Sequence, residues 1–156
     1  MQKSRKKMAQ RRYLRSAGEL VSGDSLVDWF FRQFVRVLCD EKVHIVRKRR
    51  LVNPDDPNRK IIRGLMDPDM HPSGDWVQIL LNAARSTHRN RDEEMETLIH
   101  ELAHVIFPKT GERGILSVEN ILSKRMTASQ RAAIKAFIPH HEVKRYPRAI
   151  RNIDVA

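Results

Sequence analysis

Two patterns overlap in residues 90–107, and together they restrict the fold more than any other part of the sequence. Apolar residues recur there every three or four positions, as on one side of an amphipathic helix: Met95, Leu98, Ile99, Leu102 and Ile106. At about 100° per residue, His100 and His104 point away from this apolar side. We therefore predict a helix that buries its apolar side in a core and directs both histidines toward a cleft or toward solvent.

The segment His100-Glu101-Leu102-Ala103-His104 matches the metal-binding pattern H-E-x-x-H. Residues four positions apart lie on the same side of a helix, so both imidazoles can reach one ion. The carboxylate of Glu101 can then act on a water molecule at that ion instead of binding the ion itself. Two imidazole nitrogens and one carboxylate suit zinc and leave a coordination position open. The motif therefore predicts one Zn²⁺ per chain.

The third protein ligand is not given by the motif. A histidine six residues after His104 is absent, because that position is Thr110. His140 and His141 are distant in sequence, so a carboxylate nearer the motif is favoured. Glu119 opens the next predicted helix after a chain reversal, whereas Glu112 lies in a glycine-containing loop that is less able to hold a ligand rigidly. We predict Glu119 as the third ligand, with Glu112 as the alternative.

Periodicity and turn residues predict the elements around this segment. Strong turn signals follow the first two strand patterns, and Asn90 and Thr127 are typical helix N-caps. We predict a helix over 24–40, strands over 43–52, 60–66 and 75–82, and helices over 90–107, 117–126 and 127–138. This order indicates an α+β fold in which helices cover one face of a small, mostly antiparallel three-stranded sheet.

The chain is basic, and its charge is unevenly distributed. It has 30 Lys and Arg residues against 19 Asp and Glu residues, a net charge of +11. Residues 1–15 contain seven of the bases and no acid, so the rest of the chain is only mildly basic. This segment is interpreted as a solvated tail, with phosphate neutralisation on nucleic acid as the alternative. The run 47–50 and a C-terminal set could extend a basic face: Lys144, Arg145, Arg148 and Arg151.

Length and composition favour a single domain of the globular class. We divide the chain into a basic disordered arm (1–15), a compact domain (16–139) and a basic C-terminal tail (140–156). The apolar runs are too short for a membrane span, and the basic N-terminus is not followed by the apolar stretch of a secretory signal. The single cysteine, Cys39, excludes an internal disulfide. We expect a monomeric cytoplasmic protein that does not insert into membranes.

Residues 97–104, followed by a glutamate on the next helix, resemble the gluzincin-type zinc peptidases, especially the compact minigluzincins and small phage-associated metallopeptidases. The resemblance covers mainly residues 75–126. It implies a zincin-like fold and a zinc metallopeptidase that hydrolyses a protein or peptide substrate, with Glu101 as general base. It also implies that Trp76–Leu81 forms the sheet edge that binds extended substrate backbone. Four residues are candidates for stabilising an oxyanion: Arg113, His140, His141 and Tyr146.

A function in nucleic-acid association is the rival interpretation. In one version the chain is a basic nucleic-acid-associated protein in which the metal is structural or incidental. In another, residues 1–15 recruit a peptidase to DNA-bound substrates. Binding through the arm would weaken steeply as the salt concentration rises.

Overall fold

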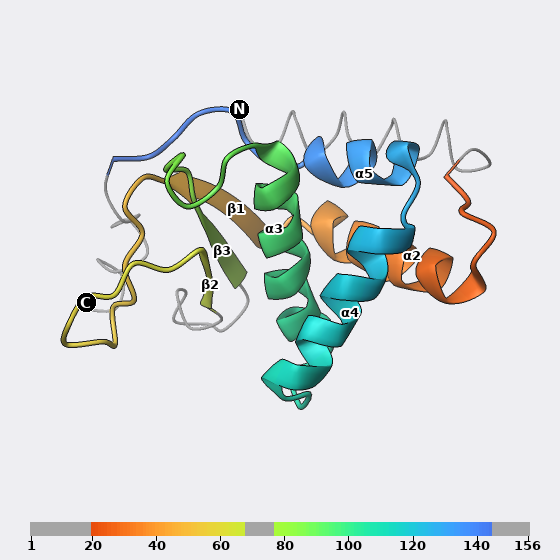
Figure 1. Ribbon diagram of the computed structural model, residues 1–156, viewed down its shortest axis with the longest axis horizontal. Coiled ribbons are helices and arrows are strands. Elements are labelled where there is room, and N and C mark those ends of the chain that lie inside the picture. The colour runs from red at the N-terminus through yellow and green to blue at the C-terminus, as the bar shows by residue number, and fades with distance from the viewer. Residues whose placement is uncertain (1–19, 68–76, 145–156) are drawn as a thin grey trace.

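The computed structural model describes residues 20–67 and 77–144. Within these ranges the chain forms helices and strands in the predicted order (Figure 1). The helices are α2 (Ser25–Cys39), α3 (Arg91–Ile106), α4 (Glu112–Arg125) and α5 (Ala128–Lys135), and the strands are β1 (Val43–Lys48), β2 (Gly64–Asp67) and β3 (Val77–Asn82). The predicted α+β class is confirmed. The basic arm at 1–15, Trp76 and Tyr146 lie outside the described residues.

The sheet is mixed, with β3 in the centre. Strand β1 runs parallel to β3, with Val43 opposite Val77, and β2 runs antiparallel to β3, with Gly64 opposite Leu81. The expectation of a mostly antiparallel sheet is therefore wrong for β1. The expectation that the segment ending at Leu81 forms a sheet edge is also wrong, because β3 is paired on both sides. The edge strand beside the metal-motif helix is β2.

Helix α3 lies between the sheet and the other helices (Figure 1). Its buried Leu98 and Leu102 belong to one core cluster with Ile79 of β3 and Phe34 of α2. On the opposite face of the sheet, Leu80 packs in a second cluster with Leu51, Ile62 and Leu65, which precede or begin β2. The apolar side of α3 is thus held from several directions, which fixes the helix relative to the sheet.

The helices begin next to the predicted residues except for α4, and α5 ends at Lys135 instead of the predicted residue 138. The Asn90 side chain accepts a hydrogen bond from the backbone N–H of Glu93 at 3.0 Å, and Thr127 forms a capping box with Gln130. Helix α4 begins at Glu112, well before the predicted start at residue 117, with Gly111 as its N-cap. None of the helices in residues 20–67 and 77–144 combines the length and apolarity needed to cross a membrane.

An ion pair between Arg47 and Glu94 connects β1 to α3. The Nε and Nη2 atoms of Arg47 both lie 2.9 Å from Oε1 of Glu94, and both side chains are largely buried. The third guanidinium nitrogen, Nη1, donates to the carbonyl oxygen of His140 at 2.9 Å. Arg47 belongs to the basic run 47–50, but its charge is used inside the fold and not on a basic face.

A second buried carboxylate, Asp28, connects α2 to α5. Its Oδ1 accepts hydrogen bonds from the backbone N–H of Ser22 at 2.9 Å, the Ser22 hydroxyl at 2.7 Å and Nε2 of Gln130 at 2.8 Å. Burial alone would raise the pKa of Asp28, but the hydrogen bonds from Ser22, Gln130 and the Gly23 backbone outweigh it and hold the pKa below its ordinary value. The ionised form is therefore the one that stabilises the fold.

We predict that Asp28→Asn lowers the free energy of unfolding by about 1–3 kcal/mol at pH 7, because neutral acceptors bind these donors more weakly. A lowered folded-state pKa contributes stability above the unfolded value, and this contribution is lost as the pH falls through the folded pKa. The difference between wild type and variant should shrink below about pH 4. Urea denaturation at pH 7 and pH 3 measures both effects. Asp55→Asn, at an exposed carboxylate, serves as the control and should change stability by less than about 0.5 kcal/mol.

Candidate metal centre

The two motif histidines lie on the side of α3 that faces away from the core. Their ring centroids are 5.0 Å apart. The His100 side chain is 18% exposed and the His104 side chain 24%, whereas Leu98 and Leu102 are fully buried. The predicted orientation of the helix is confirmed, and both imidazoles are accessible to a ligand.

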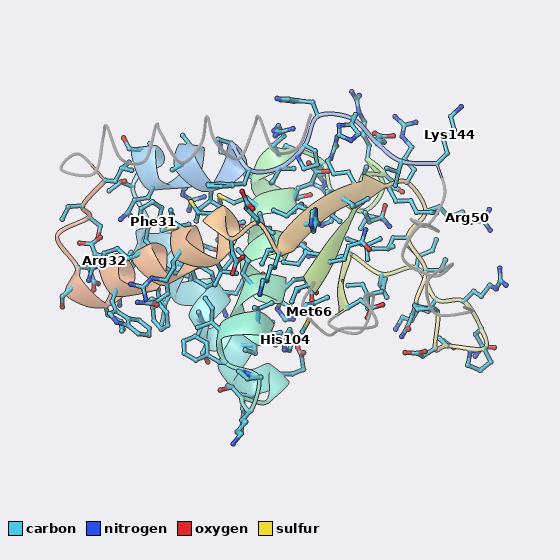
Figure 2. The ribbon with its side chains drawn as sticks, turned by 180° about the vertical axis from the view of Figure 1, so that it is seen from behind. Phe31, Arg32, Arg50, Met66, His104 and Lys144 are labelled. Atoms are coloured by element: carbon cyan, nitrogen blue, oxygen red, sulfur yellow. The ribbon has the colours of Figure 1, made fainter. Side chains whose placement is uncertain are left out.

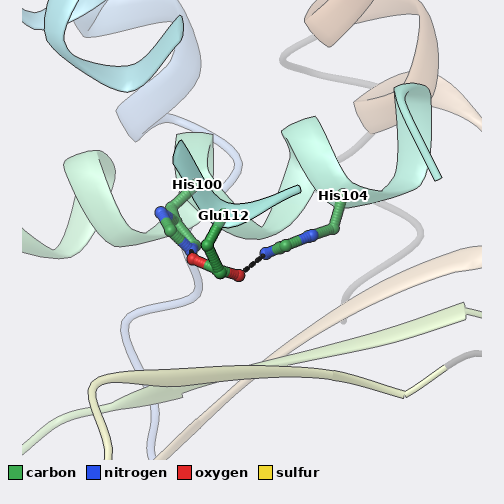
Figure 3. A group of neighbouring side chains, drawn as sticks. All are labelled: His100, His104 and Glu112. Atoms are coloured by element: carbon green, nitrogen blue, oxygen red, sulfur yellow. Dashed lines mark ion pairs between the residues drawn. The ribbon is translucent and has the colours of Figure 1, made fainter. Parts of the chain in front are cut away.

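Glu112, the first residue of α4, completes a group with these histidines (Figure 3). One carboxylate oxygen, Oε1, lies 2.7 Å from Nε2 of His104, and the other, Oε2, lies 3.2 Å from Nε2 of His100. The ligand atoms of the three side chains all lie within 4.8 Å of one another, close enough to hold a metal ion. Two imidazole nitrogens and one carboxylate are also the donor types of three-ligand zinc sites, so the residues fit this metal.

Glu119 contacts the other ring nitrogen of the same histidine. Its Oε2 lies 2.9 Å from Nδ1 of His100. The hydrogen bond with Glu119 raises the pKa of His100, burial opposes this shift, and the negative charges of Glu101 and Glu112 add to it. The two carboxylates that the sequence offers as alternative ligands therefore lie at opposite nitrogens of one imidazole, and Glu112 is the one grouped with both histidines.

The position of Glu112 depends on where α4 begins. In the sequence this residue lies between two glycines, which favours a flexible loop, but Gly111 is the N-cap and Glu112 is already helical. Glycine is an accepted N-cap residue, and an acidic residue in the first turn interacts favourably with the helix dipole. These two signals are present in the sequence and favour a helix start at this point.

Glu101 lies beside the group formed by His100, His104 and Glu112, on the side of α3 that packs against β2. The residue is 9% exposed. Burial raises the pKa of Glu101 to about 7; the positive charge of His100 and a backbone hydrogen bond from Met66 oppose this shift, whereas the charges of Glu112 and Glu119 add to it. A general base is most effective when its pKa lies near the operating pH.

Gly64 allows β2 to approach α3 closely enough for this contact. A Cβ atom at residue 64 would lie 2.6 Å from Cγ2 of Thr97, 3.2 Å from the carbonyl oxygen of Leu80 and 3.3 Å from Cγ of Glu101. The first distance is below that of real Cβ contacts, so a larger residue would displace the Thr97 side chain or the backbone at Leu80. Sequence reasoning did not identify this glycine, because the contact joins segments that are far apart in the chain.

His88 also supports α3, and sequence reasoning did not identify it. The residue is buried, with Nδ1 2.6 Å from the carbonyl oxygen of Asn82 and Nε2 2.8 Å from Oγ1 of Thr97. These bonds connect the end of β3 to α3 one turn before His100. His88 therefore has a structural role and is not among the candidate metal ligands.

The structure does not bring the C-terminal histidines to the metal group. Nδ1 of His140 lies 3.3 Å from Nη1 of Arg91, at the first residue of α3. Nine residues of helix, about 14 Å along the axis, separate Arg91 from His100. Of the four candidates for stabilising an oxyanion, Arg113 follows Glu112 directly and is exposed.

Comparisons with protein-family models, with curated proteins and with solved structures found no match. The geometry and the charges of the site are therefore the basis for its chemistry.

We predict that Gly64→Ser lowers the free energy of unfolding by about 1–3 kcal/mol, because the added atoms must displace Thr97 or the backbone at Leu80. Gly111→Ser is the matched control, since a Cβ at that position meets no atom within 4 Å and a serine can cap α4. Urea denaturation of both variants measures the difference. Equal stability of the two variants would contradict the close packing of β2 on α3.

Proposed function

We propose that the chain binds one Zn²⁺ through His100, His104 and Glu112. The proposal is supported by the contacts of both imidazole Nε2 atoms with one carboxylate, at 3.2 and 2.7 Å. In this proposal the third ligand is Glu112 and not Glu119, which the sequence favoured. Glu119 instead orients the ring of His100. A histidine that binds a metal commonly donates its other ring N–H to a carboxylate, which fixes the tautomer and the ring orientation. The 2.9 Å contact at Nδ1 fits this role.

From this ligand set we infer that the protein is a zinc-dependent metallopeptidase acting on a protein or peptide substrate. The observation that carries this proposal is the position of the buried Glu101 in the same helix turn as His100 and His104, next to the group that these histidines form with Glu112. Zinc, when bound, supplies a Lewis acid that polarises a carbonyl group and makes water more acidic. Glu101 accepts the proton of the attacking water and transfers it to the nitrogen of the leaving amine. The amide is thereby cleaved to a carboxylic acid and an amine.

The edge strand β2 supports the same proposal. Among the described strands β2 pairs only with β3, and its Met66 hydrogen-bonds to Glu101 through the backbone. An extended peptide that pairs with the outer edge of β2 would therefore run close to the general base. This edge takes the role that the family resemblance assigned to Trp76–Leu81.

We predict that Glu101→Gln retains one zinc per chain but lowers the rate of peptide cleavage at least about a hundredfold, because the amide cannot accept the proton. The zinc-loaded protein is incubated with a peptide library, cleavage is followed by mass spectrometry, and metal is measured by elemental mass spectrometry. Glu41→Gln, at an exposed position in the turn before β1, is the control and should leave both quantities unchanged. Undiminished cleavage by purified Glu101→Gln would overturn the general-base assignment.

We also predict that Glu112→Ala weakens zinc binding at least about a hundredfold, since it removes a ligand, whereas Glu119→Gln weakens it about tenfold and keeps one zinc per chain. His100→Ala should lose zinc together with activity. Competition with a chelator of known zinc affinity measures each variant. Loss of zinc in Glu119→Gln with retention in Glu112→Ala would instead establish Glu119 as the third ligand.

A further inference from the structure

Basic residues from separate parts of the chain gather at one end of the sheet. Strands β1 and β3 are parallel and end together, with Lys48 opposite Asn82, and β2 begins at the same end. Backbone hydrogen bonds join Ala83 to Lys48 and Asn82 to Arg63. We call the basic residues at this end of the sheet the strand-end basic surface. They are Lys48, Arg49 and Arg50 at the end of β1, Arg63 before β2, Arg85 after β3, and Lys144 beside the end of β1.

The C-terminal segment joins this surface through backbone pairing. The N–H of Val143 donates to the carbonyl oxygen of Arg47 at 2.8 Å, and Val143 forms a parallel bridge with Lys48. Lys144 is thereby placed beside the end of β1, and Figure 2 shows it at the same end of the molecule as Arg50. The two basic segments that are separate in the sequence therefore converge, at least as far as residue 144.

Most of these charges are available to a partner. Glu142 lies among them and pairs with Arg49 at 2.8 Å, and Nζ of Lys48 donates to the carbonyl oxygens of Arg49 and Arg50. Within residues 20–67 and 77–144, no carboxylate pairs with Arg50, Arg63, Arg85 or Lys144, and all four are exposed. The neighbouring turn at 53–60 carries two acids and two bases and so adds no net charge.

We propose that the strand-end basic surface binds the phosphate backbone of duplex nucleic acid. The four exposed cations include three arginines, whose guanidinium groups bind phosphate oxygens in a bidentate manner. Backbone pairing at the end of the sheet holds the segments that carry them side by side, and residues 1–15 add seven further bases to the same chain. The rival function considered from the sequence depends on the arm and on the two basic runs, whereas the fold joins part of these runs with Arg63 and Arg85 on one surface.

The proposed surface is separate from the metal centre. Met66 of β2, which contacts Glu101, lies opposite Ile79 near the start of β3, whereas the basic residues lie at the end of β3. Ile79 and Asn82 are three residues apart, which is about 10 Å along the strand. In Figure 2, His104 and Met66 lie apart from Arg50 and Lys144. Nucleic acid bound at the strand ends would therefore leave the metal centre accessible, and the proposal does not depend on peptidase activity.

The test compares two variants of the full chain that lose the same charge. One is Arg50→Ser, Arg85→Ser, Lys144→Ser; the control is Arg32→Ser, Arg36→Ser, Lys124→Ser, at exposed positions of α2 and α4. Binding to a fluorescein-labelled DNA duplex of about two helical turns is measured by anisotropy at several salt concentrations. Circular dichroism and urea denaturation check that both variants remain folded.

We expect the strand-end variant to bind DNA at least about tenfold more weakly than wild type at low salt, with a shallower dependence of affinity on salt because fewer counterions are released. The control should bind within about threefold of wild type. Equal weakening of the two variants would overturn the proposal, because net charge and the arm would then account for binding. The proposal would also be overturned if the wild-type protein did not bind DNA. Binding to vesicles of anionic lipid, measured in parallel, would in that case identify a membrane surface as the partner.

Discussion

The burial of one side of α3 determines the direction of the two histidines in the candidate metal centre. Leu98 and Leu102 are inaccessible to solvent, and burying a side chain of this size contributes about 1.5–3 kcal/mol. Rotating the helix about its axis would expose them, so the histidines on the opposite side have a fixed direction. Arg47 with Glu94, and His88 with Thr97, add directional contacts that prevent the helix from sliding along the sheet.

The fixed orientation of α3 also explains why three carboxylates lie close together around the turn of α3 that carries His100 and His104. Glu101 is buried against β2, Glu112 arrives from the start of α4, and Glu119 follows two turns later on the same helix. Carboxylates at such distances repel one another, and this repulsion contributes to the raised pKa of Glu101. Electrostatic repulsion of this kind within a set of polar side chains is typical of functional sites, since a bound cation would relieve it.

The two proposed activities occupy different parts of one small fold. The metal group uses α3 and the beginning of α4, whereas the strand-end basic surface uses the loops at the strand ends and the segment before residue 145. Their separation along the sheet means that each can be altered without removing the side chains of the other. A peptidase that also binds nucleic acid in this way would meet substrates that are themselves bound to nucleic acid.

The sequence by itself determined the α+β class, the metal-motif helix, the direction of His100 and His104, and the caps at Asn90 and Thr127. These features depend on interactions within one or two helical turns, so periodicity and residue type are sufficient to predict them. Only the tertiary structure decided that Glu112 joins both histidines, that β2 is the edge strand beside α3 and that the basic segments converge at Lys48. These features depend on the chain reversal before α4 and on pairing between distant segments, which local patterns do not specify.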